Sequence, residues 1–312
     1  MFDSRQVRVF HEVVRAGSFA AAARNLGYTQ PAISQQMKGL ERAVGTPLFV
    51  RAGRGLRLTE AGEVLARHAA GILGAISTAQ KQMTAITRLK AGQVRICAFP
   101  SANATLIPPA LAALRTRHPG IRIELLEGEP PGSIESLRRG DCDVALAFTY
   151  EAESEQSQPD GLVTLELLHD PLVVLLPRAH PLARRRSVEL AQLAEERWIA
   201  GCVRCRSHFV RCCAAAGFEP DIDFTTDDNL AVQSLVAAGT GIAMMPSMVQ
   251  SFLRHPDIVS RPVTPADSRI VAAYTLASLN TVPATRLMLE ALQSAADEIS
   301  GSTGSKIPAP GI

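Results

Sequence analysis

The first part of the chain carries apolar residues at helical spacing, interrupted at intervals by glycine. This pattern predicts three short helices, from about residue 4 to 16, over 19–26 and over 30–44. A residue that can cap a helix precedes each one and a glycine follows it; the caps are Asp3 or Ser4, Ser18 and Thr29, and the glycines are Gly17, Gly27 and Gly45. Two short helices joined by a glycine turn, with a polar face at the start of the second, are typical of a helix-turn-helix.

The third helix has one apolar side and one polar side. Three apolar residues recur at helical spacing and are expected to pack inward: Ile33, Met37 and Leu40. The residues left facing outward are Gln30, Ser34, Gln35 and Lys38. Glutamine can read base edges through its paired donor and acceptor, whereas serine and lysine suit phosphates. Pro31 costs little in the first turn, because the amides there have no partner within the helix.

After the third helix, residues 47–51 and 52–59 predict a small wing of two strands with a basic, glycine-containing tip. Arg51, Arg54 and Arg57 can line a track of phosphates or enter a narrow minor groove. For any one of these arginines a solvated charged turn is an equally good interpretation. Their position beside a helix-turn-helix favours contact with DNA.

A long helix is predicted to begin after Thr59 and to run to about Lys90. Its apolar residues are separated alternately by four and three positions, which is the spacing of a heptad seam: Leu65, Ala69, Ile72, Ile76, Ala79, Met83 and Ile86. Such a seam favours a dimerisation helix over a helix that packs only on its own domain. Gly71 and Gly74 each weaken this helix by about 1 kcal/mol.

From Gln93 onward, short apolar runs alternate with helical segments. The first runs predict strands over 94–99, 121–126 and 144–148, with helices over 106–117 and 133–139 between them. This order indicates a parallel sheet covered on both faces. A second set follows, with strands over 162–168, 172–176, 198–200, 222–225 and 242–245 and helices over 188–194, 204–216 and 230–238. A strand over 269–276, a helix over 282–299 and a loose tail from Gly301 complete the chain.

Charge divides the chain at the same place as the hydrophobic pattern. Residues 1–90 contain 13 lysines and arginines against 5 acidic residues, whereas residues 91–312 contain 19 against 25. A basic head on an acidic body is typical of a chain with one polyanion-binding end, and ordinary surface variation is the weaker alternative. No signal peptide and no apolar run of membrane-spanning length is predicted, so a soluble, cytoplasmic protein is expected.

Residues 18–62, SFAAAARNLGYTQPAISQQMKGLERAVGTPLFVRAGRGLRLTEAG, closely resemble the DNA-binding segment of LysR-type transcriptional regulators. The resemblance implies a dimeric winged helix-turn-helix whose third helix enters the major groove. It also implies that five residues lie at the groove, namely Thr29, Gln30, Pro31, Ser34 and Gln35. One position departs from the pattern, because Gln35 stands where many relatives carry arginine.

The same resemblance implies an α/β fold with an ordered set of parts. These are a winged helix-turn-helix in 1–58, a long coiled-coil linker helix in 59–90, an effector-binding part in 91–300 and a flexible tail in 301–312. The effector-binding part consists of two α/β subdomains of periplasmic-binding-protein type: 93–165 with 268–300, and 166–267. The expected partners are double-stranded DNA, a small-molecule effector, and a second copy bound through 59–90, with a homotetramer and RNA polymerase as further expectations.

Ligands of such sheets bind beyond the carboxyl ends of the strands, in the cleft between the subdomains. The residues expected there are Ser101, Ala102, Asn103, Phe148, Gly201, Cys202, Ser207 and Thr226. Residues 101–103 follow a strand and precede a helix, where free amides favour an anion, although Ser101 and Thr226 can equally be helix caps. The expected residues carry no fixed positive charge, and Asp227 and Asp228 disfavour a multiply charged anion. A small, largely apolar effector with at most one carboxylate is therefore expected.

Four cysteines fall within twelve residues, with His208 among them: Cys202, Cys205, Cys212 and Cys213. Three interpretations are open. The Cys-x-x-Cys with His208 or Cys212 can bind a soft metal, or neighbouring arginines can lower a thiol pKa and create a redox sensor. Alternatively, these cysteines are small core residues and Cys202 lines the cleft. A single Cys-x-x-Cys is a weak signal, so the third interpretation is favoured, and no metal or cofactor is expected.

No glycine-rich phosphate loop, HExxH motif or other catalytic constellation is present in the sequence, so an enzyme is not expected. The favoured function is a ligand-responsive transcription factor. A solute-binding protein whose basic head has another role, and an enzyme with Cys202 as nucleophile, are the alternatives. Only the first predicts tight, salt-dependent binding to a symmetric DNA site.

Overall fold

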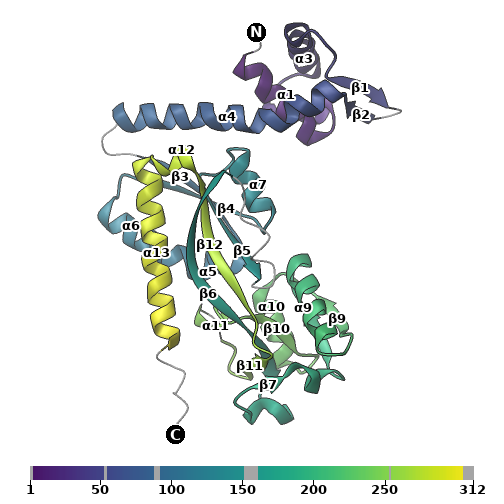
Figure 1. The fold of residues 1–312 in the computed structure, drawn as a ribbon, viewed down its shortest axis with the longest axis vertical. Coiled ribbons are helices and arrows are strands. Elements are labelled where there is room, and N and C mark those ends of the chain that lie inside the picture. Colours follow the sequence, from purple (N-terminus) through teal and green to yellow (C-terminus); the bar gives the residue numbers. More distant parts are fainter. Residues whose placement is uncertain (1–2, 53–54, 88–91, 151–160, 253, 305–312) are drawn as a thin grey trace.

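The structure is a computed structural model that describes residues 3–52, 55–87, 92–150, 161–252 and 254–304. Figure 1 shows a helical head at the N-terminal end, one long helix (α4) that runs from the head across the top of the body, and an elongated α/β body. None of the helices in these ranges is long and apolar enough to cross a membrane.

The head contains three helices whose bounds match the sequence prediction: α1 (Ser4–Ala16), α2 (Phe19–Leu26) and α3 (Gln30–Val44). A side-chain cap precedes each helix and a glycine in left-handed backbone ends it. The apolar face of α3 packs with Val7 and Phe10 of α1 in one buried core. The helix-turn-helix prediction is confirmed, and the opposite side of α3 is left open to solvent.

Strands β1 (Phe49–Ala52) and β2 (Gly55–Leu58) pair antiparallel and form the predicted wing. Glu41 of α3 positions this wing, because its Oε1 accepts hydrogen bonds from the amides of Leu48 at 2.9 Å and Phe49 at 3.4 Å. The start of α4 packs tightly on the same segment: a Cβ at Gly62 would lie 2.2 Å from the Leu48 carbonyl oxygen. The wing is therefore fixed to both α3 and α4.

Helix α4 (Glu60–Thr87) begins after Thr59, whose Oγ1 accepts a hydrogen bond from the Gly62 amide at 3.1 Å. The first residues of its apolar seam, Leu65 and Ala69, are buried in the core of the head. Farther along, the side chain of Met83 is 63% exposed in this single chain. The seam is therefore divided between two tasks: its start stabilises the head, and its later part faces solvent. The side chain of Ile86 lies outside the described residues.

An eight-stranded mixed sheet runs through the body, in the order β4-β3-β5-β12-β6-β11-β7, with β10 also paired to β6. Strands β3 (Gln93–Ala98), β4 (Arg122–Glu127) and β5 (Val144–Tyr150) are parallel, as predicted, and β12 (Ser268–Leu276) pairs antiparallel with β5. Helices α5 (Pro100–Thr105), α6 (Ile107–Arg117) and α13 (Pro283–Gly304) cover one face, and α7 (Gly132–Arg138) and α12 (Ala277–Asn280) cover the other.

One strand, β6 (Leu162–Pro177), extends through both predicted subdomains, which form the two halves of the body (Figure 1). Its residues 162–171 pair with β12, and residues 172–177 pair with β10 (Ala243–Pro246) and β11 (Ile258–Thr264). The sequence pattern predicts two separate strands here, which is wrong. Pro171 lies within the ladder opposite Ser268, and Asp170 is buried, so neither residue interrupts the strand. The pattern also does not predict β11.

The second half of the body contains a separate parallel pair, β8 (Arg197–Ala200) and β9 (Asp221–Thr225), and the helices α9 (Val203–Ala215), α10 (Asn229–Ala237) and α11 (Val249–Phe252). The helix expected over 188–194 is wrong. Strand β7 (Val188–Glu189) pairs with β11 and is followed by a 3-10 turn, η2 (Leu190–Leu193). A similar turn, η1 (Pro181–Arg184), follows β6. Helix α13 continues past the expected start of the tail, and residues 305–312 lie outside the described ranges.

Candidate functional sites

The N-terminal end of α3 forms an exposed polar surface on the head. Thr29 caps the helix, with its Oγ1 accepting a hydrogen bond from the Ala32 amide at 3.4 Å, and Pro31 occupies the first turn. The other predicted DNA-contacting residues of this helix lie on the same side, away from the buried core: Gln30, Gln35 and Lys38 are exposed and Ser34 is half-buried. The structure therefore brings these six residues together on one open surface.

The wing extends this polar surface with basic residues. Arg57 of β2 is exposed. The side chain of Arg51 and the whole of Arg54, which are predicted to follow the DNA backbone, lie outside the described residues.

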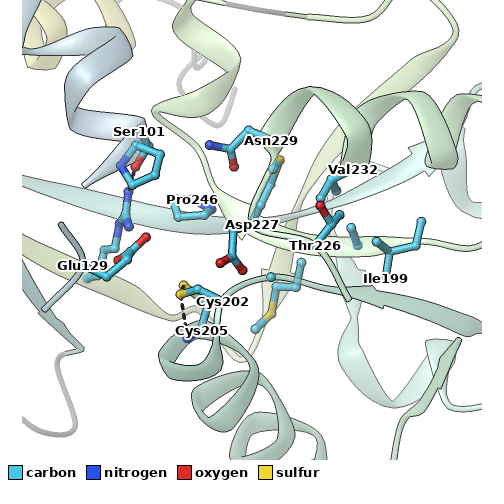
Figure 2. Close-up of a pocket in the computed structure, with 16 residues that line it drawn as sticks. Ser101, Glu129, Ile199, Cys202, Cys205, Thr226, Asp227, Asn229, Val232 and Pro246 are labelled. Carbon is cyan, nitrogen blue, oxygen red and sulfur yellow. Dashed lines mark hydrogen bonds between the residues drawn. The ribbon is translucent and has the colours of Figure 1, made fainter. Parts of the chain in front are cut away.

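A cavity lies in the body where strand ends and helix starts from both halves meet (Figure 2). It encloses about 530 Å³ of space, the open mouth included. The first half contributes the start of α5, Glu129 after β4, and Arg269 of β12; the second half contributes the starts of α9 and α10 and parts of β8 and β10. A molecule in this cavity contacts both halves at once.

Four residues predicted to contact a ligand lie on the cavity wall: Ser101, Gly201, Cys202 and Thr226. The other four do not line it: Ala102, Asn103, Phe148 and Ser207. Ala102 and Phe148 are buried in the hydrophobic core behind the wall. The side chains of Asn103 and Ser207 donate hydrogen bonds to the backbone carbonyls of Ala98 and Val203. These four side chains therefore stabilise the surrounding structure.

The wall contains a buried cation that the sequence pattern does not reveal. Arg269 is 2% exposed, and its Nε and Nη2 lie 3.0 and 2.9 Å from Oδ2 of Asp170, which is 1% exposed. Its Nη2 also donates to Ser101 Oγ at 2.9 Å, and its guanidinium lies 4.5 Å from the ring centroid of Phe148. The expectation of a pocket without a fixed positive charge is wrong, because Arg269 lines the cavity. Asp170 nevertheless neutralises this charge, so Arg269 adds little net positive potential.

Two carboxylates also line the cavity, Glu129 from the first half and Asp227 from the second. Glu129 Oε2 is buried and has no hydrogen-bond partner among the described residues. Burial raises the pKa of Glu129, and the neighbouring charge of Asp227 raises it further, although Arg269 opposes the shift. Because Arg269 is paired with Asp170, Glu129 and Asp227 make the rest of the cavity wall acidic.

Cys202 and Cys205 present their sulfurs to the same cavity. Cys202 caps α9, and its Sγ donates to Cys205 Sγ at 2.9 Å (Figure 2). This hydrogen bond lowers the pKa of Cys205 to about 7 against the opposing effect of burial, and Arg269 and Tyr150 also favour the Cys205 thiolate. The same hydrogen bond and burial raise the pKa of Cys202. Cys205 is thus the more reactive thiol of the pair.

Alkylation tests this assignment. The rate at which iodoacetamide modifies Cys205 should rise through about pH 7, because the thiolate is the nucleophile and its fraction grows above the pKa. In Cys202→Ala the rise should move to higher pH, since the hydrogen bond from Cys202 is the largest cause of the lowered pKa. Mass spectrometry of the peptide that contains Cys205 measures both profiles. A wild-type profile centred at the ordinary thiol pKa would refute the assignment.

His208, Cys212 and Asp267 form a second polar cluster, between α9 and the loop that joins β11 to β12. His208 Nε2 lies 2.5 Å from Asp267 Oδ2 and 3.3 Å from Cys212 Sγ, and Cys212 Sγ donates to the same Asp267 oxygen at 3.1 Å. Burial alone would raise the pKa of Asp267, but the hydrogen bonds from His208 and Cys212 outweigh it and lower the pKa. The ring of His208 also stacks on Tyr150 of β5, with centroids 3.4 Å apart. This stacking ties α9 to the first half of the body.

Both parts of the chain match known families. The bacterial regulatory helix-turn-helix protein family of lysR type matches residues 4–63, and the LysR substrate binding domain matches residues 87–297. The chain belongs to the LysR family of transcriptional regulators. This LysR-type chain is 30% identical over 300 residues to the probable HTH-type transcriptional regulator LrrA of Synechococcus elongatus, covering 94% of this chain and 97% of the relative. The matched family and this relative are transcriptional regulators, not enzymes.

Solved structures show the same fold. The LysR-type chain is similar to a full-length variant of OxyR from Pseudomonas aeruginosa, with a TM-score of 0.67 and 22% identity over 95% of each chain. It is also similar to full-length CbnR complexed with its target DNA, with a TM-score of 0.61 and 23% identity over 94% of this chain and all of that chain. The two family matches place the helix-turn-helix in the head and the substrate-binding domain in the body that holds the cavity.

Sequence reasoning placed Asp227 at the rim of the ligand site but missed Arg269, Glu129 and Cys205 as wall residues of this LysR-type chain. Arg269 lies near the start of a predicted strand and Asp170 lies between two apolar runs. In the sequence, each therefore resembles a residue at the exposed end of a strand. A useful signal was available in the pair: two opposite charges, each bordering an apolar run, are expected to neutralise each other if both strands are buried.

Proposed function

We propose that this LysR-type, ligand-responsive regulator reads DNA with the exposed end of α3 and binds its effector in the cavity between the two halves of the body. The observation that carries the proposal is the exposed polar side of α3, which is held by a buried core and flanked by the wing. On this proposal Thr29, Gln30, Pro31, Ser34 and Gln35 lie at the major groove, Lys38 contacts phosphate, and Arg51 and Arg54 follow the backbone. The protein acts where the bacterial chromosome lies, in the cytoplasm.

The proposed effector contacts come from both halves of the body. Ser101 and Arg269 lie on one side of the cavity, and Gly201, Cys202 and Thr226 lie on the other. A ligand that contacts both sides stabilises one relative arrangement of the halves over another, which is the requirement for a ligand to shift a conformational equilibrium. We place the change from one half to the other near Pro171 within β6, because the pairing partner of β6 changes there from β12 to β10 and β11.

Dimerisation is the further part of the proposal. The later part of α4 exposes apolar side chains, such as that of Met83, at heptad spacing, and a heptad seam buries itself only against another helix. A homodimer through residues 59–90 would present two DNA-reading heads to two half-sites. A homotetramer and contact with RNA polymerase stay predictions from the family resemblance.

Two substitutions in α3 test the DNA-reading surface. Gln30→Ala should reduce discrimination between specific and random DNA by about 1–3 kcal/mol, because it removes a side chain that pairs with a base edge. Lys38→Ala should weaken binding to all sequences alike and reduce the salt slope by about one unit, because it removes one phosphate contact. Gel shifts on the DNA upstream of the protein's own gene, and on random DNA, measure both effects over a range of salt concentrations.

Arg117→Ala is the matched control, since Arg117 is an exposed cation at the end of α6 in the body. It should leave both kinds of DNA binding unchanged. If Gln30→Ala and Lys38→Ala weakened specific and random binding by the same factor, the division of roles on α3 would be wrong. If neither substitution changed DNA binding, α3 would not be the helix that contacts DNA.

A further inference from the structure

Three side chains of metal-ligand type meet between α9 and the loop that joins β11 to β12. His208 and Cys212 of α9 are four residues apart, about one helical turn, so their side chains lie on one side of the helix. Asp267 approaches the same side from the loop. The ligand atoms of these three residues all lie within 4.8 Å of one another. None of the three residues lines the cavity proposed for the effector.

The separations of these atoms are close to those of a metal-bound set. A nitrogen, a sulfur and an oxygen on one tetrahedral zinc ion lie about 3.3–3.6 Å apart. His208 Nε2 and Cys212 Sγ are 3.3 Å apart, and Cys212 Sγ and Asp267 Oδ2 are 3.1 Å apart. His208 Nε2 and Asp267 Oδ2 are hydrogen-bonded at 2.5 Å and must move apart. Because Asp267 is a half-buried loop residue, rotation of its side chain supplies this change.

The imidazole ring is held in place without an ion. His208 is 4% exposed, and its ring stacks on Tyr150 with centroids 3.4 Å apart. This stacking directs Nε2 toward Cys212 and Asp267. Ordering of the ring therefore adds little to the entropic cost of binding. The thiol of Cys212 and the carboxylate of Asp267 are only partly buried, so an ion can reach them from solvent.

The donor atoms select the kind of ion. With its thiol deprotonated, Cys212 supplies one negative charge and Asp267 a second, while His208 supplies a neutral nitrogen. Together they neutralise a divalent cation. One sulfur, one nitrogen and one oxygen suit a borderline ion such as zinc or cobalt(II), whereas magnesium and calcium prefer oxygen ligands alone.

We propose that His208, Cys212 and Asp267 bind one zinc ion, or a similar borderline divalent ion, with water as the fourth ligand. The inference goes beyond the proposed function, because these residues are separate from the lining of the effector cavity. The backbone carbonyl of Asp267 accepts a hydrogen bond from the Leu172 amide at 2.9 Å, at the point where β6 changes its pairing partner. A bound ion therefore fastens α9 to the segment that joins the two halves of the body.

Arg211 determines the tautomer of His208 and opposes the ion. Its Nη2 lies 3.3 Å from His208 Nδ1, and because arginine can only donate, Nδ1 accepts and the ring proton lies on Nε2. An ion at Nε2 moves that proton to Nδ1, and the Cys212 thiol proton passes to solvent. Arg211 must then turn away, which its exposed position allows. Removal of Arg211 should therefore strengthen binding.

The test uses the full-length protein, reduced with a phosphine and freed of metal by a chelator. Equilibrium dialysis with Zn²⁺, alone and with excess Mg²⁺, measures affinity and stoichiometry, and the near-ultraviolet charge-transfer band of Co²⁺–thiolate bonds reports sulfur ligation. We expect one Zn²⁺ per chain, no competition from Mg²⁺, and a thiolate band with Co²⁺.

Three substitutions then separate the ligands from their neighbour. Cys212→Ala should abolish the band and weaken Zn²⁺ binding by at least about 100-fold, since loss of an outer-shell partner alone costs up to that much. Asp267→Asn should weaken binding by at least about tenfold and keep the thiolate band. Arg211→Ala should strengthen binding by about threefold or more, because it removes a like charge beside the ion.

Cys213→Ala is the matched control, because it removes the neighbouring thiol of α9, which is buried in the core of the second half. It should leave Zn²⁺ affinity and the Co²⁺ band unchanged, and circular dichroism checks the fold of every variant. Binding and a band that persist in Cys212→Ala would place the ion at other thiols and overturn the proposal. A protein that binds no Zn²⁺, or an Arg211→Ala protein that binds it more weakly, would show that the cluster is only a hydrogen-bonded structural element.

Discussion

Arg269→Met should lower the free energy of unfolding by about 3–5 kcal/mol, the range expected when one partner of a buried ion pair is removed. Arg269 and Asp170 are 2% and 1% exposed, so water cannot solvate the carboxylate that remains. Among the described residues, Asp170 would keep only the hydrogen bonds from Ser247 Oγ at 3.0 Å and the Met248 amide at 2.9 Å, which do not neutralise its charge. Urea unfolding followed by circular dichroism measures the loss.

A surface ion pair gives the matched comparison for this substitution. Arg197, 61% exposed, lies 3.3 Å from Asp223, and Arg197→Met should cost less than about 1 kcal/mol because both groups remain solvated. Adding Asp170→Asn to Arg269→Met should restore part of the stability, since the buried charge is then removed with its partner. A loss in Arg269→Met no larger than in Arg197→Met would show that water reaches Asp170, contrary to the structure.

The second large effect is expected in α4. Met83→Glu should convert the protein to a monomer and weaken operator binding by about 100-fold or more, because two linked heads bind two half-sites far more tightly than one head binds one. The side chain of Met83 is exposed in the single chain, so the substitution leaves the fold of each chain intact. In a parallel or antiparallel seam the glutamate would meet apolar side chains of the partner helix, where its charge is costly. Sedimentation velocity and gel shifts measure the two effects.

Met83→Leu keeps an apolar side chain at the same position and should preserve both the dimer and operator binding. This position is a better probe of the seam than Ile72, which packs partly on the core of the head, so that a charge there would also disturb the reading domain. A Met83→Glu protein that still sediments as a dimer would mean that surfaces of the body hold the subunits together.

Local signals in the sequence were sufficient for the head. The side chains of Asp3, Ser18 and Thr29 cap the three helices by accepting hydrogen bonds from amides of the first turn, and glycines end the helices. Each boundary therefore depends on residues a few positions apart. The body was harder because its errors involve distant partners. Val188, Leu190 and Leu193 have a spacing compatible with a helix, but residues 188 and 189 pair with β11, more than seventy positions away. Pairing with a distant strand overrides local spacing.

The cavity shows the same limit. The predicted strand ends placed Ser101, Gly201, Cys202 and Thr226 on its wall, because strand ends meet at one edge of a sheet. The prediction for Asn103 and Ser207 rests on chain position alone, and in the structure their side chains donate hydrogen bonds to nearby backbone carbonyls. Arg269 is held at the cavity by its ion pair with Asp170, 99 residues away in the chain. The hydrophobic periodicity of a sequence does not predict a pair so far apart.

Strand β6 also determines the mechanics of the body. Halves joined only by loops can rotate freely, whereas these halves share the 16-residue strand β6, which pairs with β12 in the first half and with β10 and β11 in the second. They therefore move relative to each other by bending a hydrogen-bonded sheet. The ladder is already irregular between Val271 and Ala272 of β12, and bulged positions bend most readily. If the effector binds in the cavity as proposed, we therefore expect closure around it to be elastic and small in amplitude.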